Sequence, residues 1–338
     1  INQPSSRECA MTKILITGGA GFVGYHLALK EANLGNEVTV IDSFERPNED
    51  PEFKALVEHE NVKFLQKDIS DENTFEVYLP VDHYDVVYHL AALNGTSNFY
   101  NYPAKVLKIG CLSTIYLLDW VSRHKKGKRP KVIYTSSSET YAGTANIQGD
   151  NFPIPTPEDV PLTIDDVRNV RWSYGASKLI GEVAFYSYSK MYDITDFNII
   201  RLHNIYGPRM GFEHVISQFI KRFLDGERPF KIMGSDQTRS FCFIDDVLEA
   251  FEKITQSSMQ GEIIHVGNDK EEILIADLAK IVFDIGQEAY NFDEQPAPDG
   301  SVGRRCPNID KLKSLGIRDQ IDLREGIEKT FKWYKDKL

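Results

Sequence analysis

Residues 13–24 of the chain read Lys-Ile-Leu-Ile-Thr-Gly-Gly-Ala-Gly-Phe-Val-Gly. The first five residues form a short apolar run, and an amphipathic stretch follows the glycines as far as Leu34, so the pattern is strand, glycine turn, helix. Gly18, Gly21 and Gly24 would allow a tight turn and a close approach of the backbone to a pyrophosphate at the helix N-terminus. This context predicts a dinucleotide-binding turn.

A second strand, residues 37–42, ends in an acid. Asp42 follows Gly18 by 24 residues, which is about where an acid accepts the ribose hydroxyls of NAD. A carboxylate at this position repels the 2′-phosphate of NADP, so the sequence favours NAD as cofactor.

Further strands are expected at 62–66, 85–90 and 131–135, with a long helix over 104–124. Alternation of strands and helices predicts an α/β fold with a Rossmann-type, doubly wound parallel sheet. Ligands of such sheets bind at the carboxyl ends of the strands. The expected cofactor-binding residues are therefore Gly18, Gly21, Phe22, Val23, Gly24, Asp42, Asp68, Ile69, Leu90, Ala91 and Ala92. Asp68 either meets the adenine edge or is a plain turn residue.

Residues 172–178 contain Tyr174 and Lys178, which are four apart and so share one face of a predicted helix that runs to about Met191. A free tyrosine, with a pKa of about 10, is a poor base at neutral pH, but a nearby cation favours the phenolate. The pair is a candidate for proton transfer if the chain also supplies a cofactor. Seen alone, it is also what an ordinary amphipathic helix contains.

The second half of the chain is less regular. Residues 142–171 carry four prolines and little periodicity, so we expect a long loop that acts as a functional lid. We predict a NAD-binding domain over 11–200 and, over 201–338, mainly a smaller, interleaved C-terminal α/β substrate domain. Residues 1–10 are expected to be a tag or linker, with Met11 as the natural start.

The composition excludes some classes of function. The 338 residues carry a net charge of −11, which argues against a nucleic-acid or anionic-membrane partner. No apolar run reaches the ~18 residues of a membrane span. The cysteines form no CxxC pair, which favours reduced thiols in a cytoplasmic protein and suggests no metal site. They are Cys9, Cys111, Cys242 and Cys306.

Together these motifs resemble the extended short-chain dehydrogenase/reductases that modify nucleotide sugars. The resemblance follows the family order from Met11 to the C-terminus. It rests on the glycine turn and on the segments 89–92, 136–141, 174–178, 201–209, 238–246 and 305–316.

The resemblance implies a mechanism. Tyr174 would take the proton from a sugar hydroxyl, usually at C4, and hydride would pass to NAD, leaving a 4-keto sugar. Lys178 would hold the nicotinamide ribose and favour the ionised form of Tyr174, while Ser137 would hydrogen-bond the same hydroxyl. Four residues would face the diphosphate or nucleotide of the substrate, namely Asn204, Arg209, Arg239 and Arg305.

The reaction that follows oxidation depends on Ser138 and Glu139. Decarboxylases of nucleotide-linked glucuronate have Ser-Glu here. Dehydratases often have Asp-Glu, although some have Ser-Glu, and epimerases often carry a small residue or Thr in place of Glu139. A glutamate beside a 4-keto sugar can move a proton at C5. The best expectation is decarboxylation of UDP-glucuronate or related C5 chemistry, with 4-epimerisation close behind and 4,6-dehydration third. Glu139 could also merely orient its neighbours.

The chain departs from the family around the sugar. It lacks the Asn that many members place near Gly110, Leu179 stands where glucuronate decarboxylases often have Arg, and residues 94–100 differ from the usual substrate loop. Two other functions stay open: a non-catalytic NAD-binding scaffold and a net reductase. A homodimer through the helices at 104–124 and 174–191 is expected from the family.

Overall fold

A computed structural model describes residues 11–45, 50–297, 302–317 and 320–338. The expected tag or linker at 1–10, with Cys9, lies outside these residues. No helix in the described part of the chain is long and apolar enough to cross a membrane.

The chain builds a seven-stranded parallel sheet in the order β11-β6-β5-β4-β1-β2-β3. Side chains alternate between its faces, so Ile14 and Ile16 enter one hydrophobic core and Leu15 enters the other. This confirms the predicted doubly wound sheet. Its strands are β1 (Lys13–Thr17), β2 (Glu37–Asp42), β3 (Val62–Gln66), β4 (Val86–His89), β5 (Lys131–Ser137), β6 (Phe197–Leu202) and β11 (Glu262–Val266).

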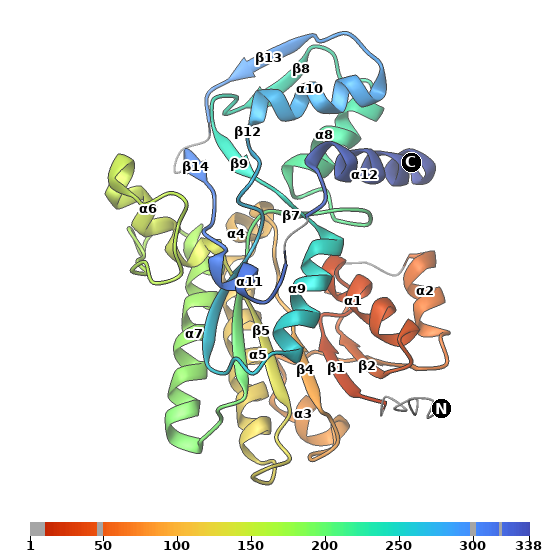
Figure 1. The fold of residues 1–338 in the computed structure, drawn as a ribbon, viewed down its shortest axis with the longest axis vertical. Helices are drawn as coiled ribbons and strands as arrows, with labels where there is room; N and C mark the ends of the chain where they lie inside the picture. Colours follow the sequence, from red (N-terminus) through yellow and green to blue (C-terminus); the bar gives the residue numbers. More distant parts are fainter. Residues whose placement is uncertain (1–10, 46–49, 298–301, 318–319) are drawn as a thin grey trace, which may run out of the picture.

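Helices cover both faces of this sheet (Figure 1). On one face α5 packs against α3 and α7, and on the other α1 packs against α2 and α9. These helices are α1 (Phe22–Asn33), α2 (Pro51–Val57), α3 (Glu72–Tyr78), α5 (Pro103–Ser122), α7 (Trp172–Tyr192) and α9 (Ile244–Gln256). Because α9 and β11 return to the large sheet, the C-terminal half contributes to both units.

A smaller α/β unit lies above the carboxyl ends of the sheet strands, at the top of Figure 1. Two small sheets, β13-β8 and β12-β9-β14, form it with their helices, and β10 pairs with β7 below them. Its strands are β7 (Ile205–Tyr206), β8 (Phe230–Met233), β9 (Thr238–Ser240), β10 (Cys242–Phe243), β12 (Glu272–Leu274), β13 (Phe292–Gln295) and β14 (Arg304–Arg305). Its helices are α8 (Val215–Leu224), α10 (Ile275–Gly286) and α12 (Leu323–Lys337), whereas α11 (Asp310–Ser314) packs against β11 of the large sheet.

The expected loop at 142–171 differs from the prediction. It opens with a helix, α6 (Ala142–Gln148), followed by the 3-10 turn η2 (Gly149–Asn151). The rest packs around its own apolar cluster, which includes Phe152, Val160 and Trp172. The backbone of Thr156 exchanges hydrogen bonds with residues 306 and 308. The segment is therefore a packed insertion tied to the strand that carries Arg305, which periodicity missed because its helix spans only seven residues.

Candidate active site

The glycine turn between β1 and α1 has no room for side chains. Gly18 has φ +72°, and a Cβ added to it would lie 2.8 Å from the Cα of Ala91. A Cβ on Gly24 would lie 2.4 Å from the carbonyl oxygen of Gly18. Gly21 caps α1 through its backbone only, so the N–H groups of Phe22 and Val23 open the helix without a side-chain cap.

Asp42 ends β2 beside this turn. One carboxylate oxygen accepts a hydrogen bond from the N–H of Ala20 at 3.1 Å, and the other accepts from the N–H of Phe44 at 2.9 Å. The predicted ribose-binding acid is therefore held against the glycine turn. Asp68 follows β3, and its carboxylate accepts from the backbone N–H and the hydroxyl of Ser70. Asp68 thus stabilises the turn after β3, and Ile69 is buried beside it.

The segment after β4 closes the other side of the turn. The N–H of Leu90 donates to the carbonyl of Thr17 at 3.2 Å, and the N–H of Ala91 donates to the Thr17 hydroxyl at 3.3 Å. That hydroxyl also bonds Nδ1 of the buried His89 at 2.8 Å. Ala92 continues the same half-buried stretch. The predicted cofactor residues are thus gathered along one edge of the sheet.

Tyr174 and Lys178 lie on the first turns of α7, where both are buried. The Lys178 Nζ lies 5.9 Å from the centroid of the Tyr174 ring and donates to the carbonyl of Thr135 at 2.7 Å. Burial lowers the pKa of Lys178 to about 8, although Glu182 and Cys111 act in the opposite direction. The ammonium therefore sits beside the phenol, as the four-residue spacing predicts.

Ser137, Ser138 and Glu139 approach the same helix from β5. The Ser137 hydroxyl accepts from the N–H of Glu139 at 3.2 Å and caps the 3-10 turn η1 (Ser138–Tyr141). A Cβ on Gly175 would lie 2.9 Å from the Glu139 carbonyl oxygen. Because Gly175, next to Tyr174, has no side chain, η1 packs directly on α7, and Ser138 of η1 is buried.

Arginines surround Glu139. Its carboxylate lies 2.5 Å from the Arg305 guanidinium and 3.5 Å from that of Arg171. Burial alone would raise the pKa of Glu139, but Arg305, then Arg171 and Arg239, hold it below the ordinary value. Strand pairing sets Arg305 beside Arg239, because the two are register partners in β14 and β9. This cluster of one carboxylate and three guanidinium groups is called the arginine cluster below.

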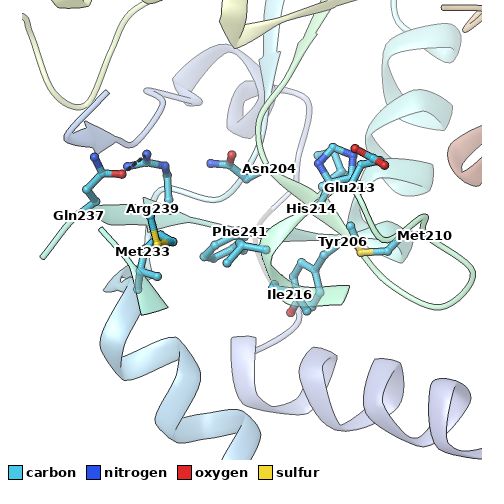
Figure 2. Close-up of a pocket in the computed structure, with 13 residues that line it drawn as sticks. Asn204, Tyr206, Met210, Glu213, His214, Ile216, Met233, Gln237, Arg239 and Phe241 are labelled. Carbon is cyan, nitrogen blue, oxygen red and sulfur yellow. Dashed lines mark hydrogen bonds between the residues drawn. The ribbon is translucent and has the colours of Figure 1, made fainter. Parts of the chain in front are cut away.

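A pocket of about 290 Å³ begins at Arg239 and extends into the smaller unit. Figure 2 shows a polar row along one side, made by Gln237, Arg239, Asn204, His214 and Glu213, with apolar side chains facing it. The apolar lining includes Met233, Phe241, Tyr206 and Ile216. The Asn204 amide donates to the carbonyl of Ser240 at 2.9 Å. The pocket suits a ligand with a flat apolar part and an anionic part.

The pocket and the tyrosine are joined through one short helix. Glu213, which lines the pocket, accepts a hydrogen bond at 2.9 Å from Ser97 of α4 (Thr96–Asn101). Phe99 of the same helix stacks on the Tyr174 ring, with centroids 5.0 Å apart. The substrate loop that departs from the family therefore contacts both ends of the site.

Arg209 lies elsewhere, contrary to the expectation that it faces the substrate. Its guanidinium pairs with Asp50 at 2.8 Å and donates to the carbonyls of Ala20 and Gly21. It is not among the residues that line the pocket. Arg209 is therefore left out of the proposed substrate site, because its guanidinium is buried against the glycine turn.

Sequence reasoning missed several residues that the fold brings to the site. Arg171 ends an aperiodic segment, and Glu213 and His214 occupy a loop with no motif. Phe99 lies in the segment 94–100, which the sequence marked as a substrate loop without singling out a residue. Arg171, three residues before Tyr174, had a usable signal in its closeness to the helix of Tyr174 and Lys178.

A dinucleotide fits the cofactor edge. Gly18 and Gly24 let the turn pack tightly against the chain's own backbone, α1 begins at its edge, and Asp42 is held beside it. A pyrophosphate would bind at the helix N-terminus, and Asp42 would accept from the ribose hydroxyls. Lys178 and Tyr174 stand further along the same carboxyl edge, beside β5.

Comparison with known proteins agrees with this geometry. A model of the NAD dependent epimerase/dehydratase family matches residues 14–267. UDP-glucuronic acid decarboxylase 5 of Arabidopsis thaliana is 31% identical over 93% of this chain and 87% of its own. A putative UDP-glucose 4-epimerase of Methanocaldococcus jannaschii is 29% identical over 96% of this chain and 98% of its own.

A solved structure of similar fold has TM-score 0.82 and 26% identity. It is UDP-glucuronic acid 4-epimerase from Bacillus cereus in complex with UDP-glucuronic acid and NAD, and the match covers 97% of this chain and 100% of that one. Sequence relatives and structural neighbour thus include both decarboxylases and epimerases.

Proposed function

Because the chain belongs to the NAD dependent epimerase/dehydratase family, we propose that it oxidises the C4 hydroxyl of a nucleotide-diphosphate sugar and then decarboxylates it at C5. The preferred substrate is UDP-glucuronate or a related sugar acid. NAD is the cofactor, and when bound it accepts and returns the hydride at C4. The glycine turn, Asp42 and Lys178 would hold it.

Tyr174, Lys178 and Ser137 have separate roles in proton transfer. Tyr174 takes the proton of the C4 hydroxyl, and the Lys178 ammonium beside it favours the ionised phenol. Ser137, at the end of β5, donates a hydrogen bond that orients the same oxygen. Phe99 covers the outer face of the Tyr174 ring and so limits its access to water.

The arginine cluster is the observation that carries the choice of an acidic sugar. Arg305 and Arg171 lie within ion-pair distance of the half-buried Glu139, and Arg239 is close enough to help lower its pKa. Guanidinium groups gathered at one position would attract a sugar carboxylate, because arginine binds carboxylates through charged hydrogen bonds. A neutral hexose would gain nothing from this charge.

Decarboxylation follows from this placement. A 4-keto group makes a C5 carboxylate a β-keto acid, so the bond between C5 and the carboxylate breaks, carbon dioxide leaves, and the electron pair passes into an enolate. C5 then takes a proton from solvent before hydride returns to C4. The neighbouring arginines hold the pKa of Glu139 below its ordinary value, so Glu139 would orient the substrate rather than donate this proton. Ser138 stands where many dehydratases carry an acid, which makes 4,6-dehydration third in order. 4-Epimerisation of a sugar acid remains the second candidate, because the cluster would hold the carboxylate in either reaction.

The test is incubation of the purified chain with UDP-glucuronate, followed by mass spectrometry of the sugar nucleotide. Loss of the mass of carbon dioxide supports decarboxylation. An isomer of unchanged mass indicates epimerisation, and loss of the mass of water indicates dehydration. UDP-glucose serves as the matched neutral substrate, and turnover of it at the same rate would contradict the role given to the arginine cluster.

We also propose a homodimer through α5 and α7. These helices pack on each other and expose apolar side chains, among them Leu107, Ile180, Val183 and Tyr186. Light scattering on the purified chain would measure the mass, and a monomer at micromolar concentration contradicts the proposal.

A further inference from the structure

The loop of residues 203–210 contacts two sites at once. Asn204, Ile205, Tyr206 and Met210 line the pocket of the smaller unit. Arg209 lies between Tyr206 and Met210 in the sequence and has φ +66°. Its side chain contacts the glycine turn and not the pocket. The loop is anchored there a second time, because the carbonyl of Pro208 lies 2.9 Å from Nε2 of His26 in α1.

Among the described residues, four groups contact the Arg209 side chain. One nitrogen donates to the carbonyl oxygens of Ala20 at 3.1 Å and Gly21 at 3.3 Å. Nε donates to Asp50 at 2.8 Å, and the guanidinium lies 4.3 Å from the centroid of the Tyr25 ring. Only 5% of the side chain is exposed. The charge is therefore directed at the turn and shielded from solvent.

The two carbonyls belong to peptide groups whose N–H groups are those of Gly21 and Phe22. The Gly21 N–H donates to the Gly18 carbonyl at 3.1 Å and so closes the turn, which leaves the Phe22 N–H to face an anion. A hydrogen bond to a carbonyl oxygen polarises its peptide and strengthens the N–H as a donor. Phe22 begins α1, where the first N–H groups have no partner within the helix and attract anions. A buried cation behind these peptides adds to the helix dipole, and low dielectric strengthens both effects.

We propose that Arg209 is a cofactor-positioning residue, which holds the glycine turn from behind and raises its affinity for the pyrophosphate of NAD. This role differs from the substrate contact that the sequence suggested. It also differs from a structural ion pair with Asp50, in which the contacts with Ala20 and Gly21 would be incidental. The inference needs only the NAD site and holds whichever sugar reaction the chain performs.

The experiment compares Arg209→Met with Asp50→Asn by calorimetric titration of the full chain, freed of bound cofactor. Asparagine preserves the helix cap that Asp50 makes to the N–H of Phe53, so this variant removes only the counter-charge of Arg209. Titrants are NAD, ADP-ribose, adenosine and UDP. Adenosine lacks the pyrophosphate, and UDP reports the substrate pocket.

For Arg209→Met we expect NAD and ADP-ribose to bind about tenfold more weakly, which corresponds to one charged hydrogen bond. Adenosine and UDP should change less than about twofold. Asp50→Asn should bind NAD as tightly as the unaltered chain or more tightly, because the carboxylate no longer competes for the guanidinium.

Two results overturn the proposal. If both variants weaken NAD binding equally, Arg209 acts through a structural ion pair with Asp50. If Arg209→Met loses UDP binding while NAD binding is unchanged, Arg209 belongs to the substrate site. If Arg209→Met does not fold, Asp50→Asn is sufficient as a test, because weaker NAD binding by Asp50→Asn would by itself contradict the cofactor-positioning role of Arg209.

Discussion

The cofactor end and the sugar end of this site are built in different ways. The cofactor end depends on one contiguous turn, residues 17–24, in which backbone atoms pack against backbone atoms. The sugar end is assembled from Glu139, Arg171, Arg239 and Arg305, which come from four separate segments and meet through charge. Close packing of backbone tolerates no added atom, whereas a charge cluster tolerates added volume but not lost charge.

This difference predicts which changes each end tolerates. The cofactor end should fail on small steric changes in the turn. The sugar end should respond to charge removal and to competing anions, because its arginines also attract anions other than the substrate and salt screens this attraction. Four experiments test this contrast, in decreasing order of expected effect.

Gly24→Ala should abolish NAD binding. The new Cβ would lie 2.4 Å from the carbonyl oxygen of Gly18, so the turn must open, at a cost of about 3 kcal/mol of unfolding free energy. Calorimetric titration and thermal unfolding measure the two effects. Gly211→Ala is the matched control, because no heavy atom lies within 4 Å of its added Cβ. Unimpaired NAD binding by Gly24→Ala would show that the turn is not close-packed in solution.

Tyr174→Phe should lower kcat roughly a thousandfold, because only the transferable proton is lost. The Phe99 stacking does not need the hydroxyl, so folding and NAD affinity should be unchanged. Turnover with UDP-glucuronate, monitored together with NAD titration, separates the two properties. Activity within tenfold of the unaltered chain would remove Tyr174 from its assigned role.

Arg305→Met should lower kcat/KM for a sugar acid roughly a hundredfold, as expected for loss of a charged hydrogen-bond pair. The adjacent Arg304→Met is the control: this side chain is 58% exposed and pairs with Glu272, so its loss should cost less than about 1 kcal/mol. Equal effects of the two variants would mean that the arginine cluster does not contact substrate.

The fourth experiment is a pH profile of kcat/KM. Burial lowers the pKa of Lys178 to about 8, so the group is cationic below that pH and loses its charge above it. The rate should therefore fall as pH rises, by about tenfold between pH 7 and pH 9. Lys178→Arg stays cationic and should flatten this limb, even if its rate is lower. A limb that persists in Lys178→Arg belongs to another group.

Much of the cofactor end was predictable because its signals are local. A glycine at φ +72°, an acid at the end of the next strand and a Tyr–Lys pair one helical turn apart are all set by spacing along the chain. Arg239 was expected to face the substrate, and it lines the pocket in the same row as Asn204. Arg209 lies in the same motif segment as Asn204, residues 201–209, yet its side chain contacts the glycine turn and not the pocket.

By itself, the sequence determined the doubly wound sheet, the family and NAD, and it set Tyr174 one helical turn from Lys178, since each of these follows from hydrophobic period or from motifs along the chain. Tertiary structure alone decided which charges meet. Arg171 and Arg305 reach Glu139 from segments 32 and 166 residues away, and the packed insertion at 142–171 holds both in place. No local pattern encodes such meetings, because they follow from how β14 pairs with β9 and how η1 packs on α7.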